Sequence, residues 1–160
     1  MIMSIYMKAD DIEGNVTDQD HPNWIQLNTV DFAGVSNFVS MDVGDLSHRI
    51  TTNPRFGQFT ITKGLDASSN YLFQYAHSRN VIDEVIIHYV STGDPNKTYF
   101  EIQLNNVFLS HFNQSHPGGD GYPSEQFNLS FQKIEQKYLG TDDSVNPIPS
   151  GYDLASATSM

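Results

Sequence analysis

The feature of this sequence that most restricts its fold is a repeated odd step in the alternation of apolar and polar residues. Successive side chains of a β-strand point to opposite faces, so apolar residues that face a core recur at every second position. Three segments keep this alternation, skip one step and resume it with the opposite parity: Ile25, Leu27 then Val30, Phe32; Phe100, Ile102, Leu104 then Val107, Leu109; Phe127, Leu129, Phe131 then Ile134, Tyr138. A regular strand cannot absorb an odd step, so each segment is expected to contain a β-bulge or a bend.

Bends in several strands predict sheets that curve around a core. The composition agrees, because the ten Phe and eight Tyr residues favour pleated, half-buried strands. Further strands are expected at residues 3–12, 59–61 and 85–90, and a chain of 160 residues has the size of a single domain, residues 1–160. We therefore predict a mainly β fold, a β-barrel of two curved antiparallel sheets, in preference to a flat sheet.

One helix is expected at about residues 67–78. Asp66 stands where a residue can cap the helix N-terminus. An apolar stripe follows at helical spacing, made of Leu72, Tyr75 and Ala76 with Arg79 beyond it. A helix with one apolar stripe must cover something, most simply one opening or face of the barrel.

A long projecting loop is expected at about residues 36–55, where the patterning is weak and interrupted by glycine and proline. A connection of this length in a compact domain usually has a function or is disordered. This one carries four apolar residues, Phe38, Val39, Met41 and Val43. We interpret these four side chains as the contacts by which the loop docks on another surface.

Composition excludes several classes of function. The chain has no cysteine, which rules out disulfides, thiolate nucleophiles and cysteine metal sites. Its formal charge of -11 argues against binding to nucleic acid, which depends on clusters of Lys and Arg. No apolar run approaches the roughly 20 residues that cross a bilayer, so no membrane association is expected.

No catalytic, metal or cofactor site is expected. The six histidines are scattered without the spacing of a zinc site, and His88 is interpreted as a surface or interface residue. Paired carboxylates at Asp10-Asp11 and Asp83-Glu84 lie beside turns or strand ends, where solvation is expected. No serine lies in a nucleophile elbow. A carbohydrate platform built on Trp24 and exposed tyrosines is a weaker alternative.

The order of these segments resembles the Hcp family, the hemolysin-coregulated proteins of the bacterial type VI secretion system. The opening run of residues 5–14 is similar to the family's first strand and turn, and Val30-Asp31-Phe32 stands where the family commonly has two tryptophans around a small residue. Residues 59–68 are similar to the family's strand-to-helix junction, in which a Thr-Lys pair precedes a capping Asp. Residues 127–138 and 150–154 are similar to its last strands and tail.

The resemblance implies a structural protein and no enzyme. Six copies would form a ring, and rings would stack into the inner tube that the apparatus expels. The implied partners are further copies of the chain, sheath and spike or baseplate components, and small effector proteins in the lumen. The implied location is the bacterial cytoplasm during assembly, then the extracellular space or a target cell, as for a virulence factor. A tail-tube protein of a phage or related contractile particle stays an alternative.

Asp31 is the residue that we expect to face the lumen. After the skipped step at residues 28 and 29, Val30 and Phe32 must point to the core, which leaves Asp31 pointing away from it. In a ring, a polar residue on that face is expected to border a solvent-filled channel.

Overall fold

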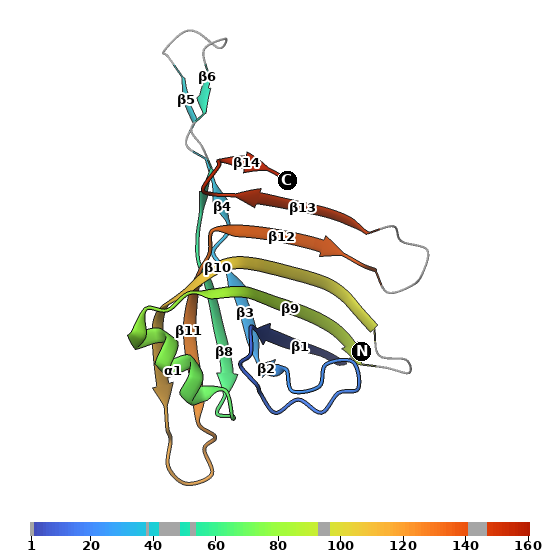
Figure 1. Ribbon diagram of the computed structural model, residues 1–160, viewed down its shortest axis with the longest axis vertical. Helices are drawn as coiled ribbons and strands as arrows, with labels where there is room; N and C mark the ends of the chain where they lie inside the picture. Colours follow the sequence, from blue (N-terminus) through green and yellow to red (C-terminus); the bar gives the residue numbers. More distant parts are fainter. Residues whose placement is uncertain (1, 38, 42–48, 52–53, 93–96, 141–146) are drawn as a thin grey trace.

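The structure is a computed structural model that describes residues 2–37, 39–41, 49–51, 54–92, 97–140 and 147–160. It consists mainly of strands with one helix among these residues (Figure 1). The elements are β1 (Ile2–Ala9), β2 (Ile25–Leu27), β3 (Thr29–Phe32), β4 (Val35–Ser36), β5 (Val39–Met41), β6 (Arg49–Thr51), β7 (Arg55–Phe56), β8 (Phe59–Gly64), α1 (Ser69–Ser78), β9 (Ile82–Thr92), β10 (Lys97–Ser115), β11 (Ser124–Ser130), β12 (Lys133–Tyr138), β13 (Ile148–Asp153) and β14 (Thr158–Ser159).

Two antiparallel sheets share the long strand β10. The first sheet has the order β14, β13, β12, β10, β9, β1, β2, and it uses the N-terminal part of β10. The second sheet has the order β10, β11, β8, β3, and it uses the C-terminal part of β10. In Figure 1 the strands of the first sheet run across the view and those of the second run down it. The chain therefore changes direction wherever it passes between the sheets.

The predicted odd steps lie at these passages, which confirms the interpretation of the alternation. The first passage is at Asn28, between β2 and β3, where the backbone N–H donates to the Thr62 carbonyl at 2.8 Å. The second is in β10, which leaves β12 after Asn105 and joins β11 at Phe108. Asn106 lies between these pairings with a positive φ of 52°, a conformation that asparagine tolerates better than most residues. The third passage separates β11 from β12.

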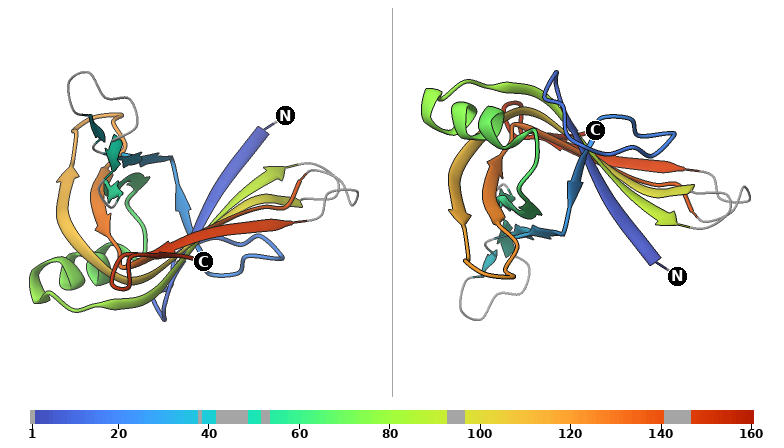
Figure 2. Two further views of the ribbon diagram at one scale, coloured as in Figure 1. Left: turned by 90° about the horizontal axis from the view of Figure 1, so that it is seen from above. Right: turned by 90° about the horizontal axis from the view of Figure 1, so that it is seen from below.

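The prediction of a mainly β fold with two curved antiparallel sheets and one helix is confirmed, but the sheets do not form a closed barrel. Strands β12, β13 and β14 continue the first sheet beyond β10, so among the described strands this sheet ends at β14 and does not close onto the second sheet. Figure 2 shows the first sheet spreading as a fan on one side while the second sheet curls on the other. The bends curve both sheets, but the first sheet does not close onto the second.

The core lies between the two sheets and contains the apolar residues that the alternation pointed inward. Its fully buried members include Ile25, Phe59, Ile87, Leu104 and Phe127. Phe32 stacks on Phe59 with ring centroids 4.5 Å apart. A second, smaller cluster of Tyr6, Val16 and Val90 packs with Trp24 on the opposite face of β1 and β9. The first sheet is thus covered on both faces along part of its length.

The helix α1 begins two residues later than expected. Ser68 occupies the N-cap position, while the Asp66 carboxylate accepts a hydrogen bond from the Ser68 backbone N–H at 2.9 Å. Asp66 therefore orders the turn before the helix. Leu72 is fully buried, and Tyr75 and Ala76 pack against the core, as the predicted stripe requires. Arg79 ends the helix in the left-handed conformation with φ 62°.

The expected long loop contains two short ribbons among its described residues. Strand β4 pairs with β7, and β5 pairs with β6. The β5–β6 ribbon extends away from the body beyond β14 (Figure 1). The segment therefore projects as predicted, but backbone pairing gives it a regular path that its weak apolar pattern did not indicate. The first predicted strand is also shorter, because Asp10 takes a positive φ of 44° and ends β1.

Candidate assembly surfaces

The predicted lumen residue Asp31 is exposed on β3. Its neighbours Val30 and Phe32 are half-buried and pack against the core, so the side chains alternate as expected. Asp31 pairs with Thr60 of β8, and Thr60 pairs in turn with Asn128 of β11. The side of the second sheet that faces away from the core therefore carries polar side chains across three strands.

The charge of Asp31 acts on Tyr89 of β9 in the first sheet. Burial raises the pKa of the Tyr89 hydroxyl, and the nearby Tyr99 and Asp31 raise it further. The position of Asp31 relative to a lumen stays a prediction, because it depends on how copies of the chain assemble.

The four predicted stacking residues belong to the projecting segment. Val39 and Met41 are the two ends of β5 and pair with Thr51 and Arg49 of β6. Phe38 and Val43 lie outside the described residues. The role of the four side chains in stacking stays a prediction, and the projection of the β5–β6 ribbon is the structural feature that favours it.

A buried ion pair lies in the segment that carries the most specific resemblance. The Lys63 ammonium is fully buried and lies 2.8 Å from Glu125 Oε2, and it lies 3.0 Å from Asp66 Oδ1. It also donates to the Gly64 carbonyl at 2.9 Å. The second oxygen of Glu125 accepts a hydrogen bond from the Gln114 side chain at 3.0 Å. Lys63 thus joins β8, the start of α1 and β11 from inside the core.

Sequence reasoning did not predict this ion pair. The partners Lys63 and Glu125 are 62 residues apart, and nothing in the local pattern links them. One signal was present: both residues fall at positions where strand alternation points inward, since Ile61 precedes Lys63 and Phe127 follows Glu125 by two residues. Charged residues at two core positions of neighbouring strands indicate a buried pair.

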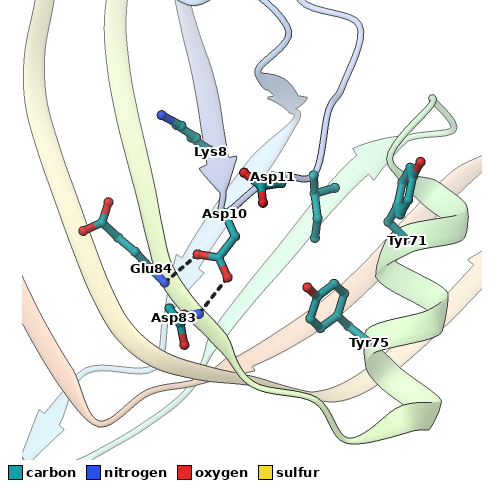
Figure 3. A pocket seen from close by; sticks show the side chains of 8 residues that line it. Lys8, Asp10, Asp11, Tyr71, Tyr75, Asp83 and Glu84 are labelled. Carbon is teal, nitrogen blue, oxygen red and sulfur yellow. Dashed lines mark hydrogen bonds between the residues drawn. The ribbon is translucent and has the colours of Figure 1, made fainter.

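A hollow of about 530 Å³ brings together the two carboxylate pairs of the sequence (Figure 3). It is lined by Lys8, Asp10, Asp11, Ile12, Tyr71, Tyr75, Asp83 and Glu84. The Asp10 carboxylate accepts hydrogen bonds from the backbone N–H groups of Asp83 and Glu84, at 2.9 and 3.0 Å. The interpretation of all four carboxylates as merely solvated is therefore wrong for Asp10, which ties the end of β1 to β9.

The hollow places two aromatic rings of the helix opposite the carboxylates. Figure 3 shows Tyr71 and Tyr75 on α1 across from Asp10, Asp11 and Glu84. Tyr71 is 53% exposed, while Phe73, which is 54% exposed, lies outside this hollow, beside His77 and Phe112. Exposed aromatic rings are enriched in surfaces that bind another protein, whereas Asp and Glu are depleted there.

The described residues contain no group of three or more His, Asp or Glu side chains that could hold a metal ion. No helix in the described part of the chain is long and apolar enough to span a membrane. Trp24, the residue proposed for a carbohydrate platform, is half-buried and packs against His21 and His88, with ring centroids 4.7 and 4.8 Å apart. Its ring is therefore occupied by contacts within the chain.

Comparisons with known proteins agree with the resemblance seen in the sequence. A family model described as "Type VI secretion system effector, Hcp" matches residues 6–138. The structure of a type six secretion system protein matches with a TM-score of 0.90 at 20% identity and covers 99% of this chain and 100% of that one. Hcp1 from Salmonella typhimurium matches with a TM-score of 0.80 at 20% identity, over 100% of both chains.

A less similar fold is that of a prophage protein. The anti-feeding prophage cap, described as a tube terminating cap, matches with a TM-score of 0.59 at 8% identity and covers 84% of this chain and 87% of that one. No curated protein has a sequence that matches this chain significantly. The solved structures show a shared fold, and the family model shows a shared sequence pattern.

Proposed function

This chain belongs to the Hcp family of the type VI secretion system, and we propose that it is a structural subunit of the inner tube of this system. The match of the family model over residues 6–138 carries the proposal. In this role copies of the chain form rings of six, and the rings stack into a hollow tube that the apparatus expels.

The described surfaces suit a subunit that assembles with itself. The β5–β6 ribbon projects beyond the body on one side and offers an extended contact for a neighbouring ring (Figure 1). The β14 edge of the first sheet and the exposed rings of Tyr71 and Phe73 offer contacts for other copies. Exposed strand edges and aromatic residues both favour association.

We infer a structural role and no enzymatic one. Among the described carboxylates of the hollow, Asp10 is bound to backbone N–H groups, and Glu84 accepts a hydrogen bond from Gln103 at 2.9 Å. These bonds commit both groups to holding β1, β9 and β10 together. A tube subunit needs such rigidity, because its contacts must repeat identically along the assembly.

The partners beyond further copies of the chain follow from its place in the apparatus. We propose that sheath proteins surround the tube, that spike or baseplate proteins provide its first ring, and that small effector proteins travel in its lumen. The chain would assemble in the bacterial cytoplasm and leave the cell with the tube.

Two alternatives fit the observations less well. A tail-tube protein of a phage-like particle would share the fold, but the similarity to the anti-feeding prophage cap is weaker than that to the type six secretion proteins, with TM-scores of 0.59 against 0.90. A carbohydrate-binding module would need an exposed aromatic platform, and the Trp24 ring packs within the chain.

Secretion by the parent bacterium tests the proposal. We expect the protein in the culture medium of cells with an intact type VI apparatus, and a strong loss from the medium when the sheath is deleted. A cytoplasmic marker protein controls for lysis. Equal amounts of this protein in the medium with and without the sheath would contradict the proposal and favour release by a phage-like particle.

A further inference from the structure

Four side chains that are distant in the sequence form a continuous chain of hydrogen bonds on the first sheet. Asp18 Oδ2 lies 2.7 Å from His21 Nδ1, and His21 Nε2 lies 2.9 Å from His88 Nδ1. His88 Nε2 lies 2.9 Å from Glu101 Oε2. Asp18 and His21 belong to the segment between β1 and β2, while His88 lies on β9 and Glu101 on β10. The chain of bonds therefore ties residues 10–24 to the sheet.

The His21 ring is enclosed by aromatic side chains, and the half-buried His88 ring lies beside it. His21 is only 4% exposed. Its ring centroid lies 5.0 Å from Tyr6 and 4.7 Å from Trp24, and His88 lies 4.8 Å from Trp24. Water has little access to the contact between the two rings. If a proton is lost or added there, water cannot readily hydrogen-bond to the ring nitrogens in place of the lost contact.

Proton counting fixes the charge that this arrangement can hold. Each carboxylate accepts a hydrogen bond, so His21 Nδ1 and His88 Nε2 each carry a proton. The two nitrogens that face each other at 2.9 Å form a hydrogen bond only if one of them carries a third proton. If that proton moves along the hydrogen bonds to a carboxylate, the number of protons held by the four groups is still three. The four groups together therefore hold three protons and a net charge of -1.

We propose that the hydrogen-bonded pair of His21 and His88, with Asp18 and Glu101, holds residues 10–24 on the first sheet. We propose that this contact opens when acid adds a further proton to it. A fourth proton would place two N–H groups opposite each other on two charged rings. The contact between the rings would then open, and Trp24 would lose its packing against them.

The charges around the pair set the direction of the pH dependence. Burial lowers the pKa of His88, the Glu101 carboxylate acts in the opposite sense, and the charge of His21 lowers it further. Further charges on the neighbouring elements are Asp20 in the segment itself, Lys8 on β1, and Lys137 of β12, which pairs with Glu101. The Tyr6 hydroxyl belongs to the ring that contacts His21.

A lowered pKa makes the folded state the weaker proton acceptor. Below about pH 6.5, the ordinary value for histidine, the unfolded chain binds the His88 proton more readily than the folded chain does. The contribution of His88 to stability therefore decreases as the pH falls through its lowered pKa, within the pH range in which the pair keeps its third proton.

Tryptophan fluorescence can follow this change directly, because Trp24 is the only tryptophan in the chain. As the pH falls from about 8 to about 5, we expect the emission maximum to move to longer wavelength with a midpoint below about 6.5, while far-ultraviolet circular dichroism stays constant. An emission spectrum that is constant over this range would overturn the proposal.

Two variants distinguish protonation of the His21–His88 contact from effects of acid elsewhere in the chain. His88→Gln removes the titrating ring, and the fluorescence transition should disappear. His111→Gln changes an exposed histidine outside the pair and should leave the transition as in the parent. A transition that survives His88→Gln, or that is lost in His111→Gln, would overturn the proposal.

A third variant keeps the test valid if His88→Gln does not fold. Glu101→Gln removes the negative charge beside His88 and keeps a side chain that can accept a hydrogen bond. Because the Glu101 carboxylate raises the pKa of His88, this variant should shift the midpoint of the fluorescence transition to lower pH. An unchanged midpoint, or a shift to higher pH, would overturn the proposal.

Discussion

At the scale of single residues, the polar groups inside this protein depend on contacts between distant parts of the chain. His21 and His88 are 67 residues apart, and Lys63 and Glu125 are 62 residues apart. Local patterns can show that a polar residue falls at an inward position, but they cannot show which partner it meets. For this reason His88 was interpreted as a surface or interface residue, and the buried ion pair was not predicted.

The Lys63–Glu125 pair is expected to be costly to break on one side only. In Lys63→Met, the buried Glu125 carboxylate loses its cation, and the free energy of unfolding should fall by about 3–5 kcal/mol. The double variant Lys63→Met with Glu125→Leu removes both charges and should recover most of this loss. Urea denaturation of both variants measures the difference.

The control for this prediction is Lys8→Met, since the Lys8 side chain is exposed. Its free energy of unfolding should stay within about 0.5 kcal/mol of the parent. If the double variant is less stable than Lys63→Met alone, the pair does not act as a coupled unit and the account of Lys63 is wrong.

Asp31 allows a second test at this scale. Its carboxylate is exposed, so Asp31→Ala should change the free energy of unfolding by less than about 0.5 kcal/mol. Thermal and urea unfolding measure this directly. A loss of several kcal/mol would mean that Asp31 has a structural partner, and its expected place on a solvent-filled lumen would then have to be abandoned.

At the scale of secondary structure elements, the alternation of apolar residues predicted the positions where strands bend. The breaks near Asn28 and Asn106, and between β11 and β12, are each visible as an odd step, because an inward side chain must change faces there. The β4–β7 and β5–β6 ribbons could not be predicted in this way. Strands β4 and β7 have two residues each, too few to show an alternation, although Phe56 of β7 packs against the core. The β5–β6 ribbon projects from the body, so no core imposes an alternating pattern on it.

The helix stripe was predicted from the sequence, and Leu72 tests it. Leu72→Ala removes a fully buried side chain and should lower the free energy of unfolding by about 2–5 kcal/mol, because a cavity is left between α1 and the sheets. Gln74→Ala, on the exposed side of the same helix, serves as the matched control and should have little effect. Equal denaturation midpoints for Leu72→Ala and the parent would show that α1 does not anchor through Leu72.

At the scale of the whole molecule, charge is expected to oppose the stacking of rings. The chain carries a formal charge of -11, so a ring of six copies carries -66. Added salt shortens the Debye length from about 30 Å at 0.01 M to about 8 Å at 0.15 M, which weakens repulsion and leaves apolar contacts intact. Tubes should therefore lengthen as the salt concentration rises, as measured by sedimentation velocity.

The projecting segment provides the variant for this experiment. Phe38→Asp replaces an expected apolar contact with a further negative charge, so this variant should form rings but stack poorly at every salt concentration. Longer tubes at low salt would show that complementary charges dominate stacking. Stacking of Phe38→Asp like that of the parent would show that Phe38 is not a docking residue.

The central claim is that the chain is a subunit of a ring, and the mass of the purified protein in solution tests it most directly. Native mass spectrometry at moderate salt should show a dominant species of six chains of 18.0 kDa, about 108 kDa in total, and negative-stain images of the same sample should show hollow rings. A protein that stays at 18.0 kDa at all concentrations, with no rings in the images, would contradict the account.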